Sequence, residues 1–141
     1  MAFQHGKSSK LKLNGTELQT FLTNISFNPT KDASETTTMG DTSRDFLEGL
    51  RNCSIQLSGR WDPTATTGPD AVVWGGYNST SLVSFIYNPT AATTFAAGSP
   101  GYTGSCWVTD FNIDDPFEDI VTWTATLQVS GNISRDTSGT Y

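Results

Sequence analysis

DASETTTMGDTSRDFLEGLRNCSIQLSGRW, residues 32–61, decides the fold of this chain because it joins a long polar segment directly to an alternating strand. Apolar residues fall at every second position in Cys53–Ser58, which predicts a β-strand with one buried face and one polar face. The threonine-rich segment before it extends from about Thr30 to Gly49 and is predicted to be a loop. Because a compact domain rarely needs so long a loop merely to connect two elements, we expect it to contact a partner.

Length and composition indicate one β-rich domain covering residues 1–141. Apolar residues make up 35% of the chain and charged residues 16%, whereas Thr, Ser, Asn and Gly are abundant. Threonine suits a pleated strand, so this balance favours β-structure with uncharged polar faces. We expect neither a cofactor nor a metal. No apolar run has the length of a membrane span, and the N-terminal MAFQHGKSSK lacks the apolar core of a signal peptide, so we expect cytoplasmic synthesis and no membrane insertion.

The charge balance argues against a protein that binds nucleic acid as its ligand. The net charge is -6 and the pI is about 4.4, whereas phosphate affinity comes mainly from clustered Lys and Arg. An acidic or neutral surface nevertheless suits a conduit past which DNA slides without binding.

Turn signals and alternating patterns predict about seven strands and one helix. Asn14-Gly15 predicts a tight hairpin turn, and Pro29 is expected to end the third strand. Pro69 and Asp70 suit the first turn of a short helix over residues 69–75, which Gly75-Gly76 would end. The expected fold is all-β, an antiparallel β-sandwich or curled sheet with one short flanking α-helix. The seven expected strands are Lys10–Leu13, Thr16–Leu18, Leu22–Pro29, Asn52–Trp61, Leu82–Tyr87, Cys106–Ile113 and Ile120–Gly131.

Two of the expected strands carry outward faces without a single charge. Exposed strands normally include Lys or Glu, which block pairing with other sheets, so strands that lack these residues either aggregate or join neighbouring sheets. The residues of the two faces are Ser54, Gln56, Ser58, Thr122, Thr124, Thr126 and Gln128.

Catalytic signatures are lacking in the sequence. His5 is the only histidine, so a Ser-His-Asp or Cys-His arrangement is not expected, and no phosphate-binding loop or HExxH motif occurs. The acidic residues of the last hairpin are open to three interpretations: a solvated turn, a calcium site, or a carboxylate pair for glycoside hydrolysis. They are Asp110, Asp114, Asp115, Glu118 and Asp119. Their mutual repulsion would be relieved by Lys or Arg from another copy, such as Arg44, Arg51 or the N-terminal lysines Lys7, Lys10 and Lys12. Cys53 and Cys106 are expected in the core, with a bridge between them left open.

Aromatic residues are also open to two interpretations, a buried core or a sugar-stacking platform. Periodicity assigns nearly all of them to the core, whereas Phe46 and Leu47 are apolar residues inside the polar segment and are expected to dock into a neighbour. The residues assigned to the core are Trp61, Trp74, Trp107, Trp123, Phe27, Phe85 and Phe111.

Several segments, in order, resemble the tail tube proteins of long-tailed bacteriophages. They are H-G-K at 5–7, L-N-G-T-E-L at 13–18, S-E-T-T-T-M-G at 34–40, F-L-E-G-L at 46–50, I-Q-L-S-G at 55–59 and V-T-W-T-A-T-L-Q-V-S-G at 121–131. The resemblance implies a β-sandwich core flanked by a helix, six copies that merge their sheets into a ring, and a long loop that reaches an adjacent ring. The two uncharged faces would then line the lumen. The implied inter-ring residues are Thr36, Thr37, Thr38, Met39, Arg44, Phe46, Leu47 and Glu48.

The expected function is therefore that of a structural virion protein without enzymatic activity. It would assemble with itself in the host cytoplasm into stacked rings of the virion tail, and DNA would pass through without specific binding. Tail-tip, tape-measure and tail-terminator proteins are the expected partners. The alternatives are a carbohydrate-binding or adhesive β-sandwich, such as a decoration or fibre domain, and a tail-terminator or head-to-tail joining ring protein.

Overall fold

The computed structural model describes residues 5–141; Met1–Gln4, the first part of the segment inspected for a signal peptide, lie outside the described residues. Seven strands form one antiparallel sheet, and a single α-helix, α1 (Pro69–Asn78), accompanies it. Two 3-10 turns cover Gly6–Ser8 and Gln19–Phe21. The strands are β1 (Lys10–Leu13), β2 (Thr16–Glu17), β3 (Leu22–Glu35), β4 (Phe46–Arg60), β5 (Val83–Asn88), β6 (Gly101–Asp114) and β7 (Thr122–Asp136).

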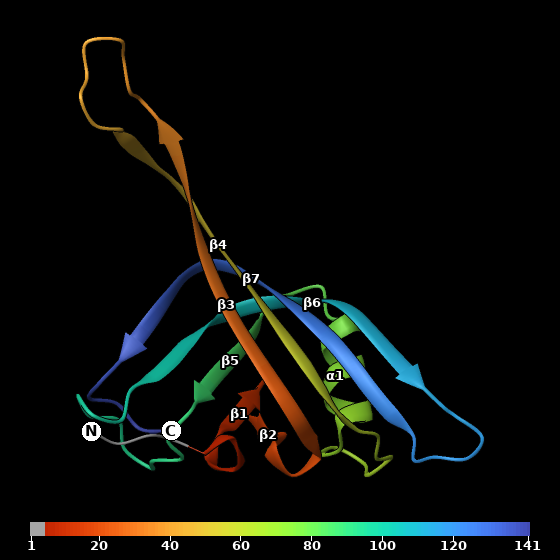
Figure 1. Ribbon diagram of the computed structural model, residues 1–141. Helices are drawn as coiled ribbons and strands as arrows, with labels where there is room; N and C mark the ends of the chain where they lie inside the picture. The colour runs from red at the N-terminus through yellow and green to blue at the C-terminus, as the bar shows by residue number, and fades with distance from the viewer. Residues whose placement is uncertain (1–4) are drawn as a thin grey trace.

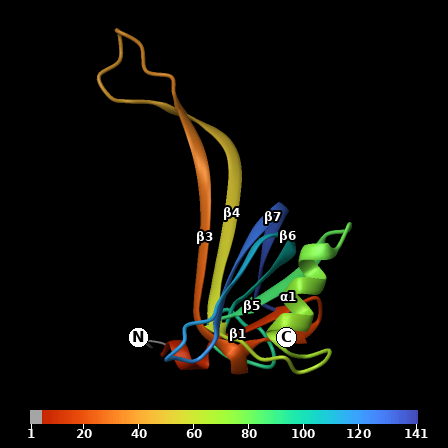
Figure 2. The same ribbon diagram turned by 90° about the vertical axis from the view of Figure 1, so that its right-hand side faces the viewer.

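The sheet has the strand order β2-β1-β5-β6-β7-β4-β3 and curls, with α1 against one of its faces (Figures 1 and 2). The prediction of an all-β curled sheet with one flanking helix is confirmed. The Asn14-Gly15 hairpin turn is confirmed as well, because both residues have positive φ, 53° and 82°, and β1 pairs with β2 across them.

Helix α1 begins where the sequence predicts but ends later. It continues through Gly75 and Gly76 to Asn78, so the predicted end at residue 75 is wrong. Glycine within a helix costs only about 1 kcal/mol, which tertiary packing can offset. At Gly76 such packing is present, because an added Cβ would lie 2.8 Å from Val108 Cγ2 of β6. Within residues 5–141, no helix combines the length and the apolar character that a membrane span requires.

The core fills the concave side of the sheet, with Val73 of α1 packed into it. Trp123 is fully buried, and its indole Nε1 donates a hydrogen bond of 3.0 Å to the backbone oxygen of Arg60. Cys53 and Cys106 are both buried and free, as expected of core residues, and no bridge joins them. Burial raises the pKa of the Cys106 thiol to about 12.

The predicted loop over 30–49 is wrong in its bounds. β3 and β4 pair from Leu22 opposite Gly59 to Glu35 opposite Phe46, so only residues 36–45 connect them. The predicted strand end at Pro29 is also wrong, because β3 lies at the edge of the sheet and a proline there needs no partner on the free side. Together the two strands project far beyond the body of the sheet (Figures 1 and 2). We call residues 30–52 the arm.

Candidate assembly surfaces

The residues predicted for the two uncharged faces lie side by side on one face of the sheet. β4 and β7 pair so that Ser54 lies opposite Gln128, Gln56 opposite Thr126, and Ser58 opposite Thr124. Between these positions Cys53, Ile55, Leu57 and the apolar residues of β7 point into the core. Thr122 completes the predicted set at the end of β7, opposite Arg60.

Strands β3 and β6 widen this polar face beyond the predicted residues. On β3, Asn24, Ser26 and Asn28 pair with Ser58, Gln56 and Ser54. On β6, Asp110, Asn112 and Asp114 pair with Thr126, Thr124 and Thr122. The sequence does contain the signal for β6, since these polar residues alternate with Phe111 and Ile113. The face therefore includes two carboxylates as well as Arg60, rather than only Ser, Thr and Gln.

Trp107 also belongs to the polar face, which corrects its assignment to the core. It pairs with Gln128 and is 38% exposed, because its neighbours Cys106 and Val108 occupy the buried side of the strand. Trp74 of α1 is likewise 50% exposed and stacks on Tyr77 with 5.2 Å between ring centroids. A helix covers the core with one side only, so an aromatic residue on the opposite side stays in solvent.

The polar face coincides with a part of the sheet that is open at both edges. β5 pairs with β6 only from Tyr102 to Cys106, so Trp107–Asp114 has a neighbour on one side alone. β3 is the other edge of the sheet. We call this part, Trp107–Asp114 of β6 with β7, β4 and β3, the four-stranded section. Since every neighbouring pair in it is antiparallel, its two open edges run in opposite directions.

At the outer end of the arm, a short polar turn is held by local hydrogen bonds. The Thr36 backbone nitrogen donates to Asp45 O at 2.8 Å, and the Thr38 nitrogen donates to the Asp41 carboxylate at 2.7 Å. Thr37 accepts a bond of 2.7 Å from the Asp45 nitrogen. The turn is therefore held by hydrogen bonds among its own residues.

Exposed apolar side chains gather on the arm. Phe46 and Leu47 lie in β4 rather than in a loop, yet they are 57% and 63% exposed. Met39 is fully exposed, and Leu50, which the sequence analysis did not single out, is 82% exposed. The sequence did contain a signal for Leu50, because it is the apolar residue that ends the segment F-L-E-G-L at 46–50. Such a group of apolar side chains in solvent is typical of a contact surface.

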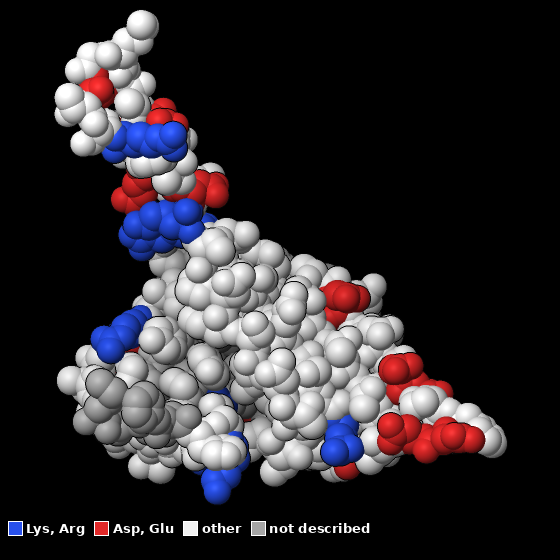
Figure 3. All heavy atoms as spheres, viewed as in Figure 1, with Lys and Arg blue, Asp and Glu red and all other residues white. Residues whose placement is uncertain are grey.

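Opposite charges form ion pairs along the arm. Glu48 lies 3.1 Å from the Lys31 ammonium and 3.5 Å from the Arg51 guanidinium, and Arg44 lies 3.9 Å from Glu35. The bond to Lys31, followed by the charges of both cations, holds the pKa of Glu48 below its ordinary value. Figure 3 shows these side chains as alternating basic and acidic bands. Arg44 and Glu48, both predicted contact residues, thus already have partners within the arm.

The acidic connection between β6 and β7 forms a tip of its own, over which acidic side chains gather in Figure 3. Phe117 at this tip is fully exposed. Among residues 5–141, no three His, Cys, Asp or Glu side chains are grouped so that they could hold a metal ion. The Asp119 carboxylate instead accepts a hydrogen bond of 2.8 Å from the backbone nitrogen of Ile120.

Comparisons with known proteins place this fold among tail and tube assemblies. No protein-family model and no curated protein sequence match the chain. A chain in the tail of an empty gene transfer agent particle with C6 symmetry matches with a TM-score of 0.77 and 16% identity, covering 95% of this chain and 99% of that one. The SPP1 tail tube matches with a TM-score of 0.76 and 13% identity, covering 97% and 80%.

A contractile system contains the same fold. A chain of the sheath-tube complex of the PVC extracellular contractile injection system matches with a TM-score of 0.63 and 13% identity, covering 92% of this chain and 88% of that one. At these identities the comparisons show a shared fold. The fold implied by the resemblance to phage tail tube proteins is therefore confirmed.

Proposed function

We propose that this chain is the structural subunit of a phage tail tube. Copies join into six-membered rings, the rings stack, and DNA passes through the resulting lumen of the virion tail. The observation that carries this proposal is the four-stranded section, in which a broad polar face coincides with two free edges of opposite direction.

Ring closure follows from those two edges. The β6 edge of one copy, Trp107–Asp114, pairs with the β3 edge of the next, and the pairing stays antiparallel around the ring. A closed barrel removes exposed edges, which an isolated subunit would present as sites of uncontrolled pairing. The ring number of six is supported by the C6 symmetry of the gene transfer agent tail, whose subunit has the same fold.

The polar face lines the lumen in this arrangement, and its chemistry suits passage without binding. Ser54, Gln56, Ser58, Thr122, Thr124, Thr126 and Gln128 contribute no charge, while Asp110 and Asp114 repel phosphate. Arg60 is the one basic residue paired into the face within the described residues. The subunit performs no chemistry itself.

Stacking is the role of the arm. Its outer part contacts the adjacent ring through Thr36, Thr37, Thr38, Met39, Phe46 and Leu47, with Arg44 and Glu48 beside them. Assembly takes place in the bacterial cytoplasm, and the ends of the tube meet the tail-tip, tape-measure and tail-terminator proteins.

Electron microscopy of the purified full-length chain tests this proposal. We expect hollow tubes at high protein concentration, with six-fold end views, growing faster when a tail-tip complex is added. Closed rings that never lengthen would instead identify a tail-terminator. Monodisperse monomers, even in the presence of a tail-tip initiator, would contradict both.

A further inference from the structure

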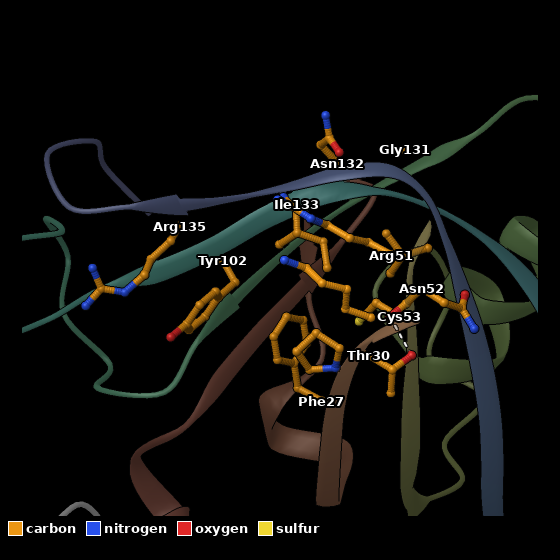
Figure 4. A pocket seen from close by; sticks show the side chains of 13 residues that line it. Phe27, Thr30, Arg51, Asn52, Cys53, Tyr102, Gly131, Asn132, Ile133 and Arg135 are labelled. Atoms are coloured by element: carbon orange, nitrogen blue, oxygen red, sulfur yellow. Dashed lines mark hydrogen bonds between the residues drawn. The ribbon is translucent and has the colours of Figure 1, made fainter. Parts of the chain in front are cut away.

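A half-open cavity of about 370 Å³ lies at the base of the arm, on the core side of the sheet (Figure 4). In Figure 4 Phe27 and Ile133 point toward each other across it, whereas Asn132 points away. Its walls also include Tyr102, Cys53 and Val129. We call it the arm-base cavity.

The inner wall of the arm-base cavity includes apolar and aromatic side chains, and its aromatic part is held by packing. The ring of Phe27 packs against those of Tyr87 and Tyr102, with centroid distances of 5.4 and 5.1 Å. Aromatic pairs at these distances attract each other beyond their buried area, so the wall is held in place. A cavity of this size and lining suits a bulky apolar side chain.

The rim of the cavity is basic. Lys31, Arg51 and Arg135 line it, and no acidic residue does. Lys31 and Arg51 share the single carboxylate of Glu48, and Arg135 makes no ion pair within residues 5–141. An excess of positive charge therefore surrounds an apolar opening, which favours an occupant that is both apolar and acidic.

The tip between β6 and β7 has this combination. Phe117 is fully exposed, and Asp115, Glu118 and Asp119 flank it in the sequence. None of these carboxylates makes an ion pair within the described residues. Both the exposed ring and the uncompensated negative charge are unfavourable in water and would be relieved by a basic, apolar site.

The tip cannot reach the cavity of its own chain. It precedes Thr122, whereas the cavity is lined from Val129 to Arg135, so at least about 20 Å of β7 separates them. The arm and the tip also lie at opposite ends of the molecule in Figure 1. The occupant must therefore come from a second copy.

We propose that the β6–β7 tip of one copy docks into the arm-base cavity of a copy in the adjacent ring, with Phe117 inside and its carboxylates facing Lys31, Arg51 and Arg135. The stacking direction rests on the proposed function. Because the contact joins two different surfaces that lie apart on the molecule, it repeats along an axis and lengthens an assembly without closing it.

Charge reversal tests the contact. A tip variant, Asp115→Lys with Glu118→Lys, and a cavity variant, Arg51→Glu with Arg135→Glu, should each still form rings but raise the concentration needed for tube growth about tenfold or more. The chain that carries all four substitutions should regain tubes, because the charges again match. Normal tubes from both reversed variants would overturn the docking while leaving the proposed function in place.

Disulfide trapping gives a second readout that does not depend on tubes or on the charge of the arm. In Phe117→Cys/Ile133→Cys, oxidation should link chains into a ladder on a non-reducing gel, since the native Cys53 and Cys106 are buried and free. Phe117→Cys/Tyr77→Cys is the matched control, because Tyr77 is 49% exposed but lies on α1, and it should give no ladder. A ladder without tubes would support the docking and contradict the tube, whereas its absence would overturn the docking in either case.

Discussion

At the scale of single residues, Gly59 marks a contact that leaves no room for a side chain. A Cβ on this residue would lie 1.9 Å from the backbone oxygen of Phe21, where the chain enters β3. We expect Gly59→Ala to lower the free energy of unfolding by about 2 kcal/mol or more, because backbone must move to admit the methyl group. Urea unfolding of the monomer, followed by tryptophan fluorescence, measures this.

Gly75 provides the matched control for that substitution. It lies within α1, and nothing is within 4 Å of an added Cβ. Gly75→Ala should therefore leave stability unchanged or increase it by up to about 1 kcal/mol, since alanine is the better helix former. Similar losses of stability in both variants would contradict a steric role for Gly59.

The two buried thiols should be inert in the folded protein. Burial raises the pKa of Cys106 from 9.0 to about 12, and it raises the pKa of Cys53 in the same direction. The thiolate is the reactive form, so at pH 8 a thiol-specific reagent should react only after unfolding. Because the folded state disfavours ionisation of Cys106, its contribution to stability is complete below pH 9.0 and falls as the pH rises toward about 12. Rapid labelling of the native monomer would refute this environment.

Residue-level prediction from the sequence succeeded where alternation is strict. Ile55, Leu57 and Trp123 were assigned to the core and are all buried. It failed for Trp107, because Cys106 and Val108 occupy the buried side of β6 and Trp107 between them lies on the opposite face. Trp74 was misassigned since a helix of ten residues leaves one of its faces in solvent.

At the scale of elements, the arm shows where sequence patterns lose their information. Alternation identifies a strand only when one face is buried, and both faces of the arm are in solvent. Residues 30–35 and 46–49 therefore read as loop although they are paired strands. The exposure of Phe46 and Leu47 was nevertheless predicted, because it depends on composition and not on secondary structure.

Glu48 is expected to hold the base of the arm together, because Lys31 and Arg51 face each other across the two strands. Its pKa lies below the ordinary value of 4.5, so its contribution is complete above pH 4.5 and is lost as the pH falls through the lower, folded pKa. Glu48→Gln should mimic this loss at neutral pH, lowering amide protection factors in the arm while those of β7 stay unchanged. The protection factors are measured on the monomer, where Glu118→Gln is the control and should leave the arm unchanged. Equal protection of the arm in Glu48→Gln and wild type would count against this role.

The apolar outer part of the arm should be needed for stacking but not for folding. Phe46→Asp combined with Leu47→Asp should preserve the circular dichroism spectrum and ring formation, because neither side chain belongs to the core, yet it should prevent tubes. Tyr77→Asp replaces a similarly exposed aromatic residue on α1 and should assemble normally. Tubes of wild-type length from the double variant would refute the stacking role.

At the scale of the whole molecule, assembly should enclose one face of the sheet and leave α1 outside. Thr124 is exposed on the polar face of the monomer, so Thr124→Cys should react readily with a bulky polymer maleimide before assembly. The same thiol should be protected in tubes, where the reagent could enter only through the ends. Tyr77→Cys should react equally in both states, and protection of Tyr77→Cys in place of Thr124→Cys would show that the rings are built inside out.

The sequence did not contain enough information to predict which edges of the sheet are open. Strand order depends on contacts between distant segments, such as the pairing of β5 with β6, which covers only Tyr102–Cys106 of β6. Alternation identified β4 and β7 as the strands with uncharged faces. It could not show that β3 and β6 lie beside them in the sheet. The carboxylates of Asp110 and Asp114 were consequently assigned to a hairpin and not to the polar face.

The thinness of the arm has a mechanical consequence. Two strands with no third layer beneath them twist and bend far more easily than the packed body of the sheet. Rings connected through such two-stranded ribbons would be rigid bodies joined by flexible connections. A long tube built in this way yields to sideways force between its rings, while the bore within each ring keeps its diameter.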